Sequence, residues 1–211
     1  MRFNIVFIKS EDRFNKRERQ KIENTIKSVV KHAAKLLKFK QNRIINFTVY
    51  RLDGKFTFGC TYSKDWIHLN VIKKFEEEDL SSAIYHEMHH IARGYYFFSK
   101  KRISFLETLF SEGLAVIFET EQLPKRIPVY AEYSDDFIKK WLPQVRKEGL
   151  WRTDFSHDEW FWGKRGKPYH LGYKLGTYLV NQIKKHNPKL TADKLTKKNV
   201  KTLLRLSKVK L

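Results

Sequence analysis

The N-terminal forty residues change from a strand pattern to a helical pattern. Residues 2–8, RFNIVFI, are rich in Ile, Val and Phe, which is typical of a strand. Residues 16–39 then repeat apolar side chains at helical spacing, and this repeat predicts a long amphipathic helix. Its apolar side consists of Ile22, Ile26, Val29, Val30, Ala33 and Leu37.

Strand patterns return in the next part of the chain. Residues 45–52 and 55–62 flank Asp53-Gly54, a dipeptide that is typical of a hairpin turn between two strands. Residues 65–74 alternate apolar and polar side chains, as a half-buried strand does. The alternating residues are Ile67, His68, Leu69, Asn70 and Val71. A mixed sheet is therefore expected.

The remainder of the chain is mainly helical by its periodicity. Two helices are expected at 79–93 and 103–120, and two more at about 171–186 and 192–208, after a region with three prolines and a tryptophan-rich loop. Asp79 or Ser81 is the expected N-cap of the first of these helices. We predict an α+β fold in which a small mixed sheet packs on the helix of residues 79–93.

The domain organisation follows from length and composition. At 211 residues and 41% hydrophobic content the chain can bury a sizeable core, and no linker rich in Gly, Ser or Pro divides it. We expect one domain over 1–211. Within it, residues 1–78 supply a helix and the sheet, 79–120 two central helices, and 121–211 a mainly helical part.

An H-E-x-x-H motif occupies residues 86–90, within the helix expected at 79–93. Because an α-helix turns about 100° per residue, His86 and His90 lie about one turn apart on the same side and can bind one metal ion. Glu87 lies farther round on that side, where it can accept a proton from a water bound to the metal. The motif therefore indicates a zinc site with an adjacent general base, although patterns of this length also recur by chance.

His89 offers an alternative pair with His86, since the two are three residues apart. Glu87 lies near His90 but about 160° around the helix from His89. Only His86 and His90 keep two ligands and the base together, so we interpret His89 as a histidine of the outer shell or of the surface.

Catalytic zinc takes three protein ligands and one open position, and Glu112 is the candidate third ligand. Residues 103–120 are apolar nearly all round, and Glu112 shares a face with Phe105, Leu109 and Val116. The small residues Gly113 and Ala115 would let the histidine helix come close. An ordinary ion pair with Arg or Lys is the alternative for this carboxylate, and Glu119 and Glu107 are weaker ligand candidates.

Three segments resemble a known family. The strings IYHEMHHIAR, SEGLA and GYKLG, within residues 79–180, are similar to the predicted zinc-dependent protease family with an HExHH motif, which belongs to the gluzincin peptidases. The resemblance implies a zincin-like metallopeptidase domain, with zinc bound by His86, His90 and Glu112 and with Glu87 as the catalytic base. It also implies that an edge strand borders the cleft, and residues 66–71 are the expected strand. His68 or Asn70 of this strand would face the cleft. The alternative is that both side chains belong to an ordinary half-buried strand.

A peptidase also needs a donor to the oxyanion of its reaction. His170 and Tyr173, at the start of the helix expected near 171, are candidates for this role, with packing as the alternative. Gly172 and Gly176 form a smooth strip on which another helix can pack. His32, His157 and His186 have no motif around them.

The chain is strongly basic. The chain carries 43 Lys+Arg against 23 Asp+Glu, a formal net charge of +20, which favours binding of nucleic acid or another polyanion. A basic nucleic-acid-binding protein with a structural or vestigial zinc site is therefore the alternative to a zinc metallopeptidase that cleaves peptide or protein substrates.

With no secretion signal, no transmembrane stretch and one cysteine, Cys60, we expect a cytoplasmic protein.

Overall fold

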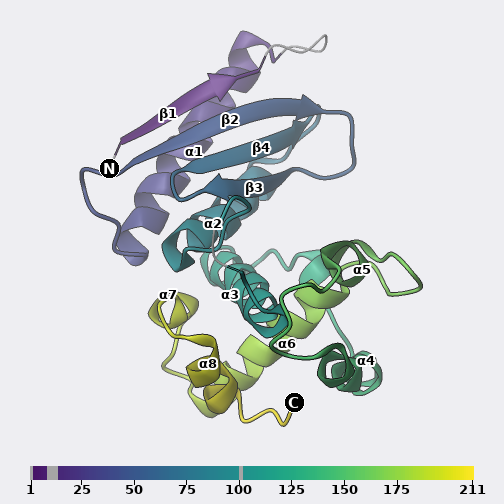
Figure 1. Cartoon of the computed structure of the whole chain (residues 1–211). Coiled ribbons are helices and arrows are strands. Elements are labelled where there is room, and N and C mark those ends of the chain that lie inside the picture. Colours follow the sequence, from purple (N-terminus) through teal and green to yellow (C-terminus); the bar gives the residue numbers. More distant parts are fainter. Residues whose placement is uncertain (1, 9–13, 100–101) are drawn as a thin grey trace. The chain divides into compact units, whose positions relative to one another are not determined.

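The computed structural model describes residues 2–8, 14–99 and 102–211. The chain forms two compact units, Met1–Ser99 and Lys100–Leu211, and each is described by itself. The first unit contains the sheet and two long helices, and the second is helical (Figure 1). The predicted α+β class is confirmed.

The sheet of the first unit has four strands among the described residues. They are β1 (Arg2–Phe7), β2 (Ile44–Leu52), β3 (Phe58–Ser63) and β4 (Trp66–Ile72), and their spatial order is β1-β2-β4-β3. The pairs β1–β2 and β2–β4 are parallel, whereas β3 pairs antiparallel with β4. The predicted mixed sheet is therefore confirmed.

The hairpin predicted at Asp53-Gly54 is wrong. The strand that follows this dipeptide does not pair with β2, because β4 lies between them. The inward side chains of β4, Ile67, Leu69 and Val71, are completely buried, which suits a strand paired along both edges. The actual hairpin joins β3 to β4 through the turn at Lys64 and Asp65.

Two helices cover one face of this sheet, α1 (Lys16–Leu36) and α2 (Glu77–Arg93) (Figure 1). Helix α1 begins with a capping box between Asn15 and Glu18, and its predicted apolar side is buried. Helix α2 begins with Glu76 as its N-cap, so the N-cap predicted at Asp79 or Ser81 is wrong. It ends at Gly94, whose φ of 79° suits glycine.

The second unit is built around two crossing helices, α3 (Phe105–Gln122) and α6 (Leu171–His186). A Cβ atom on Gly113 would lie 2.2 Å from the backbone of Gly176, so the two backbones meet at these glycines. The helix that approaches Gly113 within its own unit is therefore α6. The strip formed by Gly172 and Gly176 has the expected packing role, because Phe161 fills the space beside Gly172.

Shorter elements complete the second unit. They are η1 (Val129–Ala131), α4 (Asp135–Glu148), α5 (His157–Trp162), α7 (Ala192–Leu195) and α8 (Val200–Ser207). The helix predicted at 192–208 is thus divided into α7 and α8. In the described part of the chain, no helix combines the length and the apolar character that crossing a membrane requires.

Candidate metal centre

The two motif histidines lie one turn apart on helix α2. Their ring centroids are 4.6 Å apart, and His86 and His90 are only 6% and 5% exposed. The helix packs against α1 on one side and against β3 and β4 on another, which explains why residues 80–92 are buried throughout. Leu80, Ala83, Ile84, Met88 and Ile91 form an apolar stripe at helical spacing and belong to this buried surface.

Glu87 is held by the edge strand β3. The Thr61 hydroxyl lies 2.7 Å from Glu87 Oε2 and 3.1 Å from the Glu87 carbonyl oxygen, so it can donate to either acceptor. Gly59 also lies against this side chain, because a Cβ atom at this position would be 2.4 Å from Glu87 Cγ. The carboxylate is 5% exposed and is fixed between a hydroxyl donor and a glycine backbone.

Sequence reasoning missed Thr61 and Gly59. One signal for Gly59 was present, since an isolated glycine inside a strand pattern often marks a close approach by another group. No local pattern singles out Thr61, because its partner Glu87 lies 26 residues away.

Two further ring side chains lie close to the motif: His89 within the helix and Tyr95 just after it. His89 is fully buried, so the surface interpretation of this histidine is wrong. Tyr95, directly after the C-terminal glycine of α2, packs its ring 4.8 Å from the ring of His90. The tyrosine restricts how the His90 imidazole can rotate.

The edge strand also differs from expectation. Strand β4 lies inside the sheet and β3 lies at its edge, so the assignment of residues 66–71 as the edge strand is wrong. His68 and Asn70 are half-buried and alternate with the inward Ile67, Leu69 and Val71. They lie on the sheet face opposite α2, which agrees with the ordinary-strand alternative.

Glu112 belongs to the second unit, on the buried side of α3. It is 4% exposed, and Phe105, Leu109 and Val116 on the same side are completely buried, as the periodicity predicts. Burial lowers the pKa of His157, and the nearby negative charge of Glu112 partly offsets this by raising it. His157, at the start of α5, is thus an electrostatic neighbour of Glu112 that sequence reasoning missed.

The other acidic candidates of α3 are placed differently. Both carboxylate oxygens of Glu119 lie 3.0 Å from the hydroxyl of Tyr130, which donates to them. Glu119 therefore has a neutral hydrogen-bond donor within its own unit. Glu107 lies in the first turn of α3 and is only half-buried.

His170 and Tyr173 lie together in an aromatic cluster of the second unit. His170 is the N-cap residue of α6 and has φ of 64°, and burial together with the charge of Lys174 lowers its pKa to about 4. The ring of Tyr173 lies 5.8 Å from that of His170, 5.5 Å from Tyr130 and 5.1 Å from Phe161. The neutral imidazole of His170 retains one N–H donor at neutral pH.

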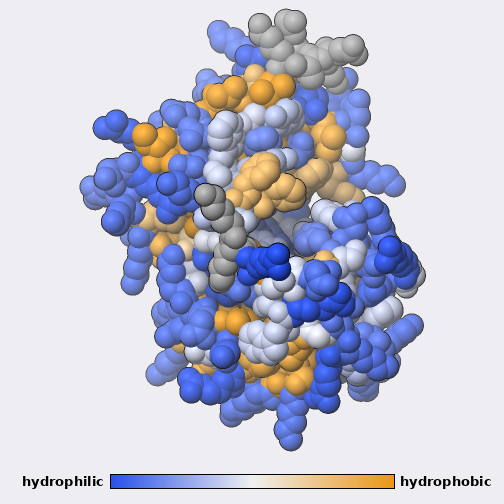
Figure 2. Space-filling view, viewed as in Figure 1, coloured by the Kyte–Doolittle hydropathy of each residue, from blue (hydrophilic) through white to orange (hydrophobic). Residues whose placement is uncertain are grey.

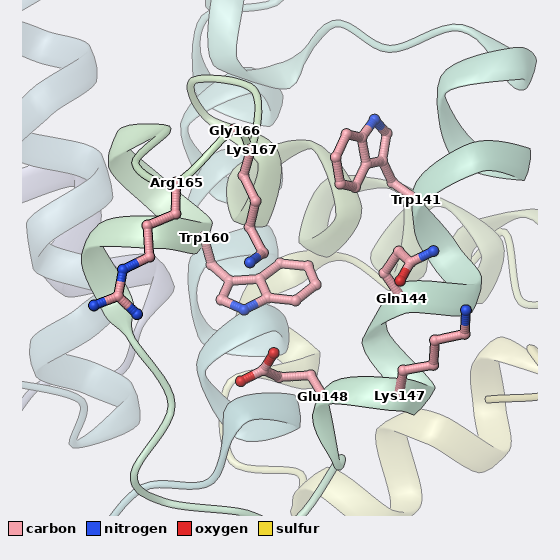
Figure 3. A pocket seen from close by; sticks show the side chains of 8 residues that line it. All are labelled: Trp141, Gln144, Lys147, Glu148, Trp160, Arg165, Gly166 and Lys167. Carbon is pink, nitrogen blue, oxygen red and sulfur yellow. The ribbon is translucent and has the colours of Figure 1, made fainter.

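A separate pocket of the second unit contains none of these residues. It has a volume of about 280 Å³ and lies between α4 and the segment after α5, where Lys167 stands over the ring of Trp160 (Figure 3). Its cations Arg165 and Lys167 both pair with Glu159, at 2.8 Å. These ion pairs neutralise two of the cations that line the pocket.

The chain is similar to one known family over most of its length. Residues 17–205 match the family described as "Predicted Zn-dependent protease (DUF2268)". The chain belongs to this family. The match includes α2 with its motif, α3 with Glu112 and the start of α6, which are the three segments that carry the resemblance. Neither a curated protein nor a solved structure shows a significant match.

Membership in a family of predicted zinc-dependent proteases agrees with the arrangement on α2. Such an enzyme needs two imidazoles and one carboxylate on its central helix. Helix α2 has two buried imidazoles one turn apart and, between them in sequence, a hydrogen-bonded carboxylate.

Proposed function

We propose that this protein is a zinc metallopeptidase of the gluzincin type. His86, His90 and Glu112 would hold zinc, and Glu87 would act as the general base in hydrolysis of a peptide bond. The observation that carries the proposal is the hydrogen bond of Thr61 to Glu87, beside two buried histidines, because it orients a carboxylate where the motif needs a base. Membership in a family of predicted zinc-dependent proteases supports it.

The donor set fits zinc by its chemistry. Catalytic zinc sites combine imidazole and carboxylate ligands and leave one position open for water. His86 and His90 supply two buried imidazoles, and Glu112 supplies a buried carboxylate. Burying a carboxylate is costly unless a cation compensates its charge, so a metal ion would stabilise Glu112 where it lies.

Bound zinc would supply a Lewis acid that lowers the pKa of a coordinated water and polarises the substrate carbonyl. Glu87 accepts a proton from the attacking water and then returns it to the departing amine. Thr61 holds the carboxylate in one orientation through both steps, which reduces the reorganisation needed for proton transfer. His170 or Tyr173 would donate to the developing oxyanion.

The edge strand offers a way to bind the substrate main chain. Strand β3 lies at the sheet edge, and its residue Gly59 lies against Glu87. An extended peptide that adds to an exposed strand edge is bound by main-chain hydrogen bonds, largely without regard to its sequence. Because the Thr61 and Tyr62 carbonyl oxygens already accept from the backbone of Phe97 and Phe98, the peptide would align along the other end of β3, at Gly59, and would there pass the general base.

Metal analysis of purified variants tests the ligands. We expect His90→Ala and Glu112→Gln to lose zinc and the wild type to contain about one ion per chain. Two matched controls are available: His89→Ala removes the neighbouring buried histidine, and Glu119→Gln changes another buried carboxylate of α3. Equal zinc content in wild type and His90→Ala, with both folded by circular dichroism, would refute the ligand assignment.

Activity assays test the base separately. Glu87→Gln should retain zinc but lose hydrolysis of labelled casein, because the amide cannot accept the proton. A wild type that binds zinc tightly and cleaves neither casein nor a proteome-derived peptide mixture would instead support a structural or vestigial zinc site.

A further inference from the structure

The sheet face opposite the helices carries a group of ring side chains, which we call the aromatic face. It comprises Tyr50, Phe58, Tyr62, Trp66, His68, Phe97 and Phe98. Strand pairing places most of them: His68 is aligned with Cys60 and Thr48, and Asn70 with Phe58 and Tyr50. Phe97 and Phe98 join the face because their backbone N–H groups donate to Thr61 and Tyr62 of β3.

Most of these rings contact one another, and several are open to solvent. His68 lies 3.9 Å from Tyr62, 5.3 Å from Tyr50 and 6.1 Å from Trp66, measured between ring centroids. Trp66, Phe97 and Phe98 are 46%, 72% and 65% exposed, whereas large apolar side chains are usually buried. Figure 2 shows white and pale orange side chains gathered over the sheet, with blue hydrophilic groups around them.

One hydrogen bond orients the exposed indole. Trp66 Nε1 donates to Thr48 Oγ1 at 2.7 Å, and Thr48 belongs to the neighbouring strand. The indole therefore lies across the sheet surface and does not project from it. Asparagine side chains lie on the same face, where Asn4 donates to Asn46 at 2.9 Å. The face thus combines ring planes with amide groups able to pair with base edges.

The charge around the aromatic face is predominantly positive. Among the described strand residues that point to this face, none is acidic and Arg2 is basic. At one end of the strands Arg43 and Lys64 lie with Asp65, which acts electrostatically on Arg43, and at the other Lys73 and Lys74 lie with Asp53, so cations outnumber carboxylates at each end. The whole chain carries a net charge of +20. An anionic partner is favoured over a neutral one.

We propose that the aromatic face binds single-stranded nucleic acid, with bases stacked on its rings and phosphates near the basic margins. Proteins that bind single strands combine these two features, because every base has a flat face and every linkage a negative charge. Paired bases in a duplex are already stacked on each other, so the rings gain nothing from them. A membrane surface is less suited, because Trp66 lies along the sheet instead of projecting into lipid.

Fluorescence anisotropy of a labelled oligothymidylate of about 16 nucleotides tests the proposal at several salt concentrations. We expect the wild type to bind the single strand more tightly than a duplex of the same length. The double variant Phe97→Ser/Phe98→Ser should raise the Kd at least about tenfold, since the loss of even one base stack has an effect of this order. Its salt dependence should match that of the wild type, because no charge changes.

Two further variants sharpen the result. Trp66→Leu keeps an apolar side chain but removes the indole, and should weaken binding like the double variant. Trp151→Ser removes a tryptophan that is 50% exposed in the second unit, and should leave the Kd unchanged. An unchanged Kd for the double variant overturns the proposal, as does equal binding of duplex and single strand. The proposal is also overturned if the wild type self-associates and the double variant does not. It is likewise overturned if the wild type binds phosphatidylserine vesicles but not the oligonucleotide.

Discussion

The hydroxyl of Thr61 lies 2.7 Å from Oε2 of Glu87 and donates a hydrogen bond to it. This bond joins the edge strand β3 to the middle of helix α2, and both residues are at most 5% exposed. A buried carboxylate with a directional donor adopts one rotamer, whereas a carboxylate in solvent samples several. The orientation of the proposed base is therefore determined by a strand as well as by its own helix.

Thr61→Val should reduce hydrolysis without releasing zinc. Valine has nearly the same shape but cannot donate, so Glu87 loses its fixed orientation, and changes in residues that support a metal site typically cost about 10- to 100-fold in activity. The measurement is kcat for casein peptides together with zinc content. Thr61→Ser should restore most of kcat, because the donor is retained. Thr48→Val, a buried threonine on the other face of the sheet, is the matched control, and a loss of kcat in it equal to that in Thr61→Val would contradict the positioning role.

Gly59→Ala should displace the same carboxylate by a different route. The added methyl group would lie 2.4 Å from Glu87 Cγ, a separation that real Cβ atoms do not adopt, so the glutamate must move. We expect a loss of activity of about tenfold or more with zinc retained. Gly54→Ala is the control, since its Cβ would meet only the flexible end of Leu52, at 3.2 Å. Full activity in Gly59→Ala would show that Glu87 has room to shift without consequence.

The α+β class and the motif helix could be predicted because both depend on local periodicity. The apolar stripe of α2 and the relation of His86 to His90 follow from helical geometry alone. The buried side of α3 around Glu112 could be predicted for the same reason. Each of these features is contained within about twenty consecutive residues.

The contacts that complete the site could not be predicted, because they depend on which strands become neighbours. Asp53-Gly54 resembles a hairpin turn between β2 and β3. However, β4 is more completely buried than β3 and lies between these two strands. Only that strand order makes β3 the edge strand and brings Thr61 to Glu87. His157 was missed similarly, since its relation to Glu112 arises from the packing of α5 in the second unit.

Gly176→Ala should destabilise the second unit. Its added Cβ would lie 2.2 Å from the carbonyl oxygen of Leu109, which is rigid helix backbone. The helices α3 and α6 must then separate, and overpacking of this kind costs about 3 kcal/mol of unfolding free energy. Urea denaturation followed by circular dichroism measures the loss. Lys185→Ala, an exposed position on the same helix, should have little effect; an equal loss in both variants would argue against the close crossing.

His170 should stay neutral through the range in which an ordinary histidine gains a proton. Burial, assisted by the charge of Lys174, lowers its pKa from 6.5 to about 4. Because the unfolded chain binds this proton more readily than the folded chain, the contribution of His170 to stability is complete above about pH 6.5 and declines as the pH falls towards 4.

His170→Asn removes the titrating ring and keeps a residue that tolerates the positive φ. The urea midpoint of the wild type should therefore fall more between about pH 7 and about pH 5 than that of His170→Asn. His157 has a pKa lowered by burial in both proteins, so the difference between them isolates His170. Equal pH dependence in the two proteins, or an imidazole carbon resonance of His170 that shifts near pH 6.5, would show that the ring is protonated like a solvent-exposed one.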